Sequence, residues 1–252
     1  MTAASGRNQA EWSAVATPLA GRRLARAAAL VAVVMLALSA CGGDDEASDG
    51  ATVPVYSGAV PQANEAIDLR PAPSGEVHDV AMVGDSITVA STDAIEKAVQ
   101  SLGVDLTIRA EVGRRIGSGE TPAPGTSIVD EILADDTPDL WVIALGTNDL
   151  GQFDTDEEYQ AAIENLLSLI PSGTPVAWIN TYVVAKPDES AQFDAALQSV
   201  LQRRGRATIG NWAVLADGDG VLSDGIHPTD DGATLFAGVV ESQIEDWQQQ
   251  TS

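Results

Sequence analysis

The 252-residue chain has few of the residues that build metal, redox or nucleic-acid sites. It contains one cysteine, so no disulfide can form within the chain, although an oxidising compartment is permitted. With two histidines beside that single cysteine, a zinc site is not expected. Basic residues number 13 against 37 acidic ones, which argues against nucleic-acid binding because phosphate contacts need clustered Lys and Arg. We therefore expect neither a metal nor another cofactor, and no nucleic-acid partner.

The apolar run near the N-terminus is too short to span a membrane. It covers residues 27–38, whereas a membrane-spanning helix needs roughly 20 apolar residues. Arg22, Arg23 and Arg26 precede it and form a basic flank. A basic flank followed by an apolar run of this length is typical of a signal peptide. We expect residues 1–40 to be removed during export.

Leu38-Ser39-Ala40-Cys41 follows directly after the apolar run. This tetrapeptide resembles the processing box of bacterial lipoproteins. The resemblance implies cleavage before Cys41 and a diacylglyceryl thioether on its sulfur, so that the protein is anchored to the extracytoplasmic face of the cell membrane. The alternative is an ordinary secretory signal followed by an incidental cysteine.

The segment after Cys41 has the composition of a tether. Residues 1–40 contain four Arg and one Glu, so the remaining chain has 9 basic and 36 acidic residues and a net charge of −27. Residues 41–76 are rich in Gly, Ala, Ser, Asp, Pro and Glu, with few large apolar side chains. Such a stretch cannot bury enough surface to order itself, which predicts a flexible tether. The acid excess suits a soluble surface protein.

Residues 77–252 alternate short β-branched runs with amphipathic stretches, which predicts one domain. Alternating strands and helices indicate a parallel sheet covered by helices on both faces. We therefore expect a three-layer α/β/α sandwich whose parallel, flavodoxin-like sheet has about five strands. The expected strands are 77–83, 104–112, 140–145, 176–183 and 207–212, and the expected helices are 91–102, 126–133, 156–170, 189–204 and 229–247.

Three short strings contain residue types that can activate a hydroxyl group: 84–86 (Gly-Asp-Ser), 146–149 (Gly-Thr-Asn-Asp) and 224–228 (Asp-Gly-Ile-His-Pro). Together they supply a serine, an amide donor, and an Asp and a His three residues apart. These groups can make a hydroxyl nucleophilic and stabilise the oxyanion that results. The first two strings follow expected strands, and ligands bind at the carboxyl ends of parallel strands.

These strings, with a glycine after the second strand, resemble the four sequence blocks of the SGNH, or GDSL, hydrolase family. The resemblance covers the domain from Val77 onward, and the glycine block also resembles that of the extracytoplasmic SGNH domains of envelope O-acyltransferases. It implies that Ser86 is the nucleophile, His227 its base and Asp224 the residue that orients the imidazole. The backbone N–H groups of Ser86 and Gly113 and the side-chain amide of Asn148 would bind the oxyanion.

Each of these residues also has a structural interpretation. Ser86 can cap the helix that follows, and Asp224 can be a turn residue before a glycine. Gly117 and Gly119 lie close to Gly113 and are alternatives for the glycine block. His78 has no companion carboxylate at a spacing that would indicate a catalytic pair, so we interpret it as structural.

Neighbouring polar residues are assigned to the scaffold. Asp85 and Asp149 are expected to brace loops by bonding backbone N–H groups. Arg114 and Arg115 either face an anionic substrate or pair with nearby carboxylates. Residues 217–220 (Asp-Gly-Asp-Gly) suggest calcium, but Val221 and Leu222 stand where oxygen ligands are needed, which favours a turn.

The sequence thus predicts a lipid-anchored serine esterase that acts through an acyl-enzyme, on O-acetyl or other short acyl esters of envelope glycans. Its partners would be an acylated small-molecule or glycan substrate and the membrane reached through Cys41, and we expect a monomer. Three alternatives remain: a lipase or thioesterase on longer acyl chains, an O-acyltransferase, and a non-catalytic glycan-binding lipoprotein.

Overall fold

The computed structural model describes residues 64–66 and 76–251. The predicted signal peptide 1–40, Cys41 and most of the predicted tether 41–76 lie outside the described residues. Among those described, no helix combines the length and hydrophobicity that crossing a membrane requires.

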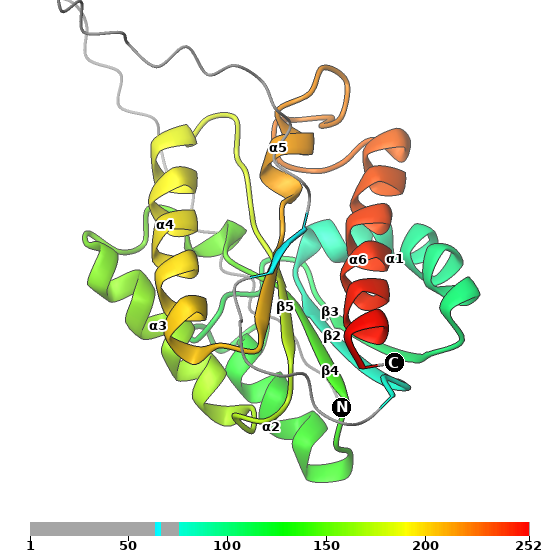
Figure 1. Cartoon of the computed structure of the whole chain (residues 1–252). Helices are drawn as coiled ribbons and strands as arrows, with labels where there is room; N and C mark the ends of the chain where they lie inside the picture. Colours follow the sequence, from blue (N-terminus) through cyan, green and yellow to red (C-terminus); the bar gives the residue numbers. More distant parts are fainter. Residues whose placement is uncertain (1–63, 67–75, 252) are drawn as a thin grey trace, which may run out of the picture. The chain divides into compact units, whose positions relative to one another are not determined.

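A parallel sheet forms the centre of the domain (Figure 1). Its five parallel strands are β2 (Asp79–Gly84), β3 (Asp105–Ala110), β4 (Leu140–Ala144), β5 (Val176–Ile179) and β6 (Ala207–Gly210). They lie in the order β3-β2-β4-β5-β6, which is 2-1-3-4-5 by position along the chain. This is the flavodoxin-like order, so the predicted fold class is confirmed.

Helices cover both faces of the sheet (Figure 1). One face carries α1 (Ser86–Val99), α5 (Trp212–Ala216) and α6 (Asp230–Thr251). The other face carries α2 (Gly125–Asp135), α3 (Asp156–Leu169) and α4 (Pro187–Arg204). Two short 3-10 helices, η1 (Gln100–Leu102) and η2 (Thr147–Asp149), follow α1 and β4.

Strand β4 shows why the sheet is buried on both sides. All five of its residues are buried. Leu140 and Val142 pack with the residues of α1 and α6, whereas Trp141 and Ile143 pack with those of α2, α3 and α4. Successive side chains of a strand point to opposite faces, so a continuous apolar run supplies both cores.

One strand lies inside the segment predicted to be a tether. β1 (Asn64–Ala66) pairs antiparallel with β6 at the edge of the sheet (Figure 1, cyan). The prediction of a flexible tether is therefore wrong for these three residues. It rested on the lack of apolar side chains, whereas pairing with an exposed sheet edge needs backbone N–H and C=O groups.

Several other element boundaries differ from the prediction, and local contacts accompany three of these differences. α1 begins at Ser86 rather than Ser91, because Asp85 caps it by accepting a hydrogen bond from the Ile87 N–H. β5 ends at Ile179, and further along the chain the Val183 N–H bonds instead to the Ser190 hydroxyl on α4. Trp212 begins α5 rather than ending a strand, and its ring packs edge-on against Phe236.

Candidate active site

Ser86 lies just after the carboxyl end of β2, the strand between β3 and β4. That strand ends at Gly84, Asp85 caps the helix, and Ser86 is the first residue of α1. The Asp85 carboxylate accepts the Ile87 N–H at 3.0 Å, so Asp85, and not Ser86, caps the helix. The Ser86 hydroxyl is thereby left for other contacts, although the residue is only 8% exposed.

The loop before α6 brings His227 and Asp224 to Ser86. The Asp224 Oδ1 atom accepts the backbone N–H groups of Ile226 and His227 at 3.0 and 2.8 Å. Its Oδ2 atom lies 2.8 Å from His227 Nδ1, and His227 Nε2 lies 3.0 Å from Ser86 Oγ. Carboxylate, imidazole and hydroxyl thus form one continuous line of hydrogen bonds.

Hydrogen bonds keep the Asp224 carboxylate ionised. The His227 backbone N–H, the His227 side chain and the Ile226 N–H together lower the pKa of Asp224 to about 2. An ionised carboxylate on Nδ1 selects the tautomer in which Nδ1 carries hydrogen and Nε2 is the acceptor. In this tautomer His227 can take the proton of the Ser86 hydroxyl.

Gly113 lies in a tight turn beside the end of β2. The Arg114 N–H donates to the Glu111 carbonyl at 3.2 Å, and Gly113 has a φ of +82°, which the third position of a type II turn requires. The Glu111 N–H donates to the Gly84 carbonyl at 3.3 Å, which holds the turn against β2. The turn's own hydrogen bond uses the Arg114 N–H and not that of Gly113.

Asn148 belongs to η2, directly after β4, and contacts both neighbouring loops. Its Nδ2 atom donates to the Arg114 carbonyl at 3.1 Å and, more weakly, to Asp85 Oδ2 at 3.4 Å. The structure therefore brings Asn148 to the residue before Ser86 and to the residue after Gly113.

Asp85 and Asp149 are buried carboxyl groups that brace these loops, as predicted. Asp149 accepts the Ile116 N–H through both oxygens, at 3.4 and 3.2 Å. Burial raises the pKa of Asp149 to about 7 and that of Asp85 to about 6, while the hydrogen bonds from Ile116 and Ile87 act in the opposite direction. Both side chains therefore hold the polypeptide in position around Ser86.

Arg114 is buried, and its guanidinium donates to protein acceptors. Its guanidinium donates to the Glu111 carboxylate at 3.3 Å and to several backbone carbonyls. Of the two interpretations of Arg114, pairing within the protein is the one observed.

His78 and Asp217, two further polar residues considered from the sequence, bond to other partners. His78 is exposed and pairs with Glu76 at 3.0 Å. Asp217 accepts the Tyr182 hydroxyl at 2.7 Å within a loop. The described residues contain no group of three or more His, Cys, Asp or Glu side chains arranged to hold a metal ion.

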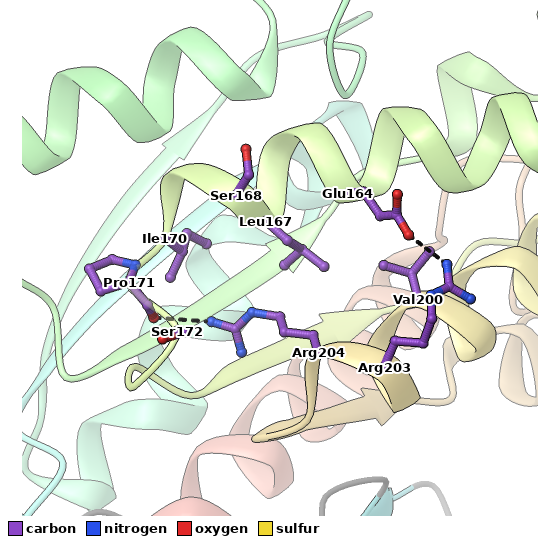
Figure 2. A pocket seen from close by; sticks show the side chains of 9 residues that line it. All are labelled: Glu164, Leu167, Ser168, Ile170, Pro171, Ser172, Val200, Arg203 and Arg204. Atoms are coloured by element: carbon purple, nitrogen blue, oxygen red, sulfur yellow. Dashed lines mark hydrogen bonds and ion pairs between the residues drawn. The ribbon is translucent and has the colours of Figure 1, made fainter.

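Two pockets lie on the α2–α4 side of the domain. One, of about 450 Å³, lies between the loop after β3 and helix α3, and is lined by Gly117, Ser118, Phe153, Glu158, Ala161, Ala162 and Asn165. The other, of about 380 Å³, lies between the carboxyl-terminal parts of α3 and α4 (Figure 2). These parts precede β5 and β6, so the second pocket is at the opposite end of the sheet from Ser86. Its Arg203 pairs with Glu164 at 2.6 Å, and its Arg204 donates to the Pro171 carbonyl at 3.3 Å.

Comparison with known proteins identifies one family. The model of the GDSL-like lipase/acylhydrolase family matches residues 82–235, a range that contains Ser86, Gly113, Asn148, Asp224 and His227. A search of curated proteins found no match.

Several solved structures share the fold. The C-terminal catalytic domain of Streptococcus pneumoniae peptidoglycan O-acetyltransferase A is 19% identical, with a TM-score of 0.53, and the match covers 69% of this chain and 97% of that domain. TesA is 18% identical, with a TM-score of 0.56 and coverage of 67% and 98%. A lipase/acylhydrolase from Enterococcus faecalis is 18% identical, with a TM-score of 0.54 and coverage of 67% and 96%.

We predict that Asp149 makes stability depend on pH. The unfolded chain releases this proton near pH 3.8, whereas the folded protein holds it until about pH 7. The folded state therefore binds more protons between these values, and the free energy of unfolding falls as pH rises through this window. Asp149→Asn should remove about 3 kcal/mol of the fall between pH 5 and pH 8, as measured by urea denaturation.

Asp130→Asn is the matched control, because it removes one negative charge from an exposed position on α2. It should leave the pH dependence of unfolding in place. An Asp149→Asn protein with the same pH dependence as the unmodified protein would show that this carboxyl group does not carry the effect.

Proposed function

Because the chain belongs to the GDSL-like lipase/acylhydrolase family, we propose that it is a serine esterase in which Ser86 forms an acyl-enzyme. The observation that carries this proposal is the 3.0 Å contact between His227 Nε2 and Ser86 Oγ, with the Asp224 carboxylate on the other ring nitrogen. A serine hydroxyl is a poor nucleophile until an adjacent base takes its proton. The residues needed for that step converge here.

In the first step, His227 takes the Ser86 proton while Oγ attacks the carbonyl carbon of the ester. The carbonyl oxygen becomes an oxyanion, and the bond to the alcohol oxygen then breaks. That oxygen takes the proton from His227 and leaves as the alcohol. A water molecule, or the hydroxyl of an acceptor sugar, attacks the acyl-enzyme by the same route and regenerates Ser86.

Three donors would stabilise the oxyanion: the backbone N–H groups of Ser86 and Gly113 and the side-chain amide of Asn148. The Ser86 N–H lies at the first turn of α1, where N–H groups have no partner within the helix. Asn148 makes its weaker bond, 3.4 Å, to Asp85. An oxyanion beside Ser86 would replace this bond, while the 3.1 Å bond to the Arg114 carbonyl would keep the amide oriented.

We propose short acyl esters of envelope glycans, such as O-acetyl esters, as the substrates. This proposal rests on the resemblance of the glycine block to that of envelope O-acyltransferases. The shared fold of a domain described as a peptidoglycan O-acetyltransferase also supports it. An acceptor hydroxyl in place of water would make the protein an O-acyltransferase by the same chemistry.

Two other functions remain as alternatives. A lipase or thioesterase would favour longer acyl chains, and the dependence of turnover on chain length separates it from an acetylesterase. Each methylene buried in a pocket contributes about 0.8 kcal/mol, roughly fourfold in kcat/KM. A non-catalytic glycan-binding lipoprotein would hydrolyse no ester, and the contact between His227 and Ser86 argues against this alternative.

We further propose that the mature protein begins at Cys41 and is held at the extracytoplasmic face of the membrane by a lipid on that cysteine. Residues 41–63 would then act as the tether, with the domain continuing from β1. The protein would function as a monomer, since the residues of the proposed site all come from one chain.

We predict that Ser86→Ala abolishes hydrolysis of p-nitrophenyl acetate, because, among the described residues, Ser86 supplies the hydroxyl that bonds His227 Nε2 and can pass its proton to it. The thermal midpoint should stay nearly unchanged, since the substitution removes one hydroxyl whose partner, the His227 imidazole, is partly exposed and can bond to water instead. Ser91→Ala, five residues further along α1, is the matched control, because its buried hydroxyl lacks a hydrogen-bond partner among the described residues. Turnover that survives Ser86→Ala would reject the assignment.

We predict that Cys41→Ser abolishes lipidation. Cells that express the unmodified protein and are fed an alkyne-labelled fatty acid should attach the label to it, and the Cys41→Ser protein should carry none. The unmodified protein should also fractionate with membranes. Equal labelling of the two proteins would show that the anchor, if present, is not on Cys41.

A further inference from the structure

Arg114 is the buried residue with the most extensive contacts near the proposed site. Its side chain is enclosed, with 3% of the residue exposed. Nε donates to the Ala123 carbonyl at 3.0 Å, and Nη2 to the Glu111 carboxylate at 3.3 Å. Nη1 donates to the carbonyls of Gly84 at 3.1 Å and Arg109 at 2.5 Å. The guanidinium therefore joins four separate points of the chain.

These four points surround the turn that contains Gly113. Gly84 is the last residue of β2 and stands two residues before Ser86. Arg109 lies near the end of β3, and Glu111 begins the turn. Ala123 lies on the chain that returns toward α2. One side chain thus ties the turn to the strand that leads to the nucleophile.

The backbone of Arg114 also bonds the loop that follows β4. The Arg114 carbonyl accepts the Asn148 amide at 3.1 Å, and Asn148 follows β4. Arg114 consequently contacts the three chain segments that supply the proposed oxyanion donors: it bonds β2 just before Ser86, adjoins Gly113, and accepts from Asn148.

We propose that Arg114 is the positioning residue of the oxyanion site. It holds the Gly113 turn and the Asn148 amide at fixed positions relative to Ser86. This inference rests on the proposed function. Arg114 does not touch substrate, because its guanidinium is buried and directed at protein acceptors. It acts by fixing where the donors point.

Arginine is suited to this role in a way that lysine is not. The guanidinium is planar and presents five N–H donors in a fixed fork, whereas an ammonium is a point charge with three rotatable donors. Only the fork can reach Gly84, Arg109, Glu111 and Ala123 together. Replacing Arg114 with Lys keeps the positive charge and loses the fixed geometry.

We predict that Arg114→Lys lowers kcat for p-nitrophenyl acetate by about 10- to 100-fold and leaves KM within about threefold. The upper figure corresponds to an oxyanion donor displaced by about 1 Å. A role in stability alone would lower the thermal midpoint without changing kcat at a temperature where the protein is folded. An unchanged kcat in the folded Arg114→Lys protein would overturn the inference.

A double-mutant cycle with Asn148→Ala tests whether Arg114 acts through the oxyanion donors. Residues that act together are non-additive, so Arg114→Lys should lower kcat several-fold less in the Asn148→Ala background than in the unmodified protein. Equal losses in the two backgrounds would contradict the proposal.

If Arg114→Lys does not fold, a second variant tests the same inference. Glu111→Gln weakens the bond that the Glu111 carboxylate accepts from Arg114 Nη2, and it should lower kcat by a smaller factor while KM is retained. An unchanged kcat in Glu111→Gln would also contradict the inference.

Arg203→Lys is the matched control, because Arg203 is half exposed and pairs with Glu164 at the other end of the sheet (Figure 2). It should keep the kcat of the unmodified protein. If the unmodified protein hydrolyses no ester, or if Ser86→Ala keeps its turnover, the proposed function fails and the inference with it. If Ser86→Ala is inactive while Arg114→Lys keeps full kcat, only the inference fails.

Discussion

The hydrogen bond between His227 and Ser86 joins residues that are 141 positions apart in the chain. It forms because β2, which lies between β3 and β4, and the loop before α6 both lead to the carboxyl end of the parallel strands. Because the strands are parallel, their carboxyl ends all lie at the same end of the sheet, and the loops after β2, β3 and β4 lie together there. Every other feature of the candidate site depends on that convergence.

The environment of each carboxyl group sets its role. Asp224 is exposed, and hydrogen bonds from His227 and Ile226 lower its pKa to about 2, so it is ionised and can orient an imidazole. Asp85 and Asp149 are buried, and burial raises the pKa of each. These two brace the loops by accepting backbone N–H groups. In a chain with 37 acidic residues, burial and hydrogen bonding therefore distinguish the residue suited to catalysis from the residues that support the loops.

The elements defined by strong local patterns could be predicted from the sequence. The apolar run of β4 and the helix α3, whose Thr155 and Glu158 form a capping box, lie within a residue or two of the expected positions. The start of α1 could not be predicted, because it depends on the conformation in which Asp85 caps the helix. β1 was missed because its pairing uses backbone groups of β6. Sequence motifs identified Ser86, His227, Asp224 and Asn148 as candidates. They did not decide whether Arg114 faces an anionic substrate or pairs within the protein, because its burial depends on tertiary packing.

The central claim is that His227 activates Ser86. The most direct measurement is the rate and position of labelling by a fluorophosphonate, with the adduct located by mass spectrometry of proteolytic fragments. The account predicts one adduct per chain, on Ser86, formed rapidly in the unmodified protein and very slowly in His227→Gln. An adduct on another residue, or equal labelling rates in the two proteins, would contradict it.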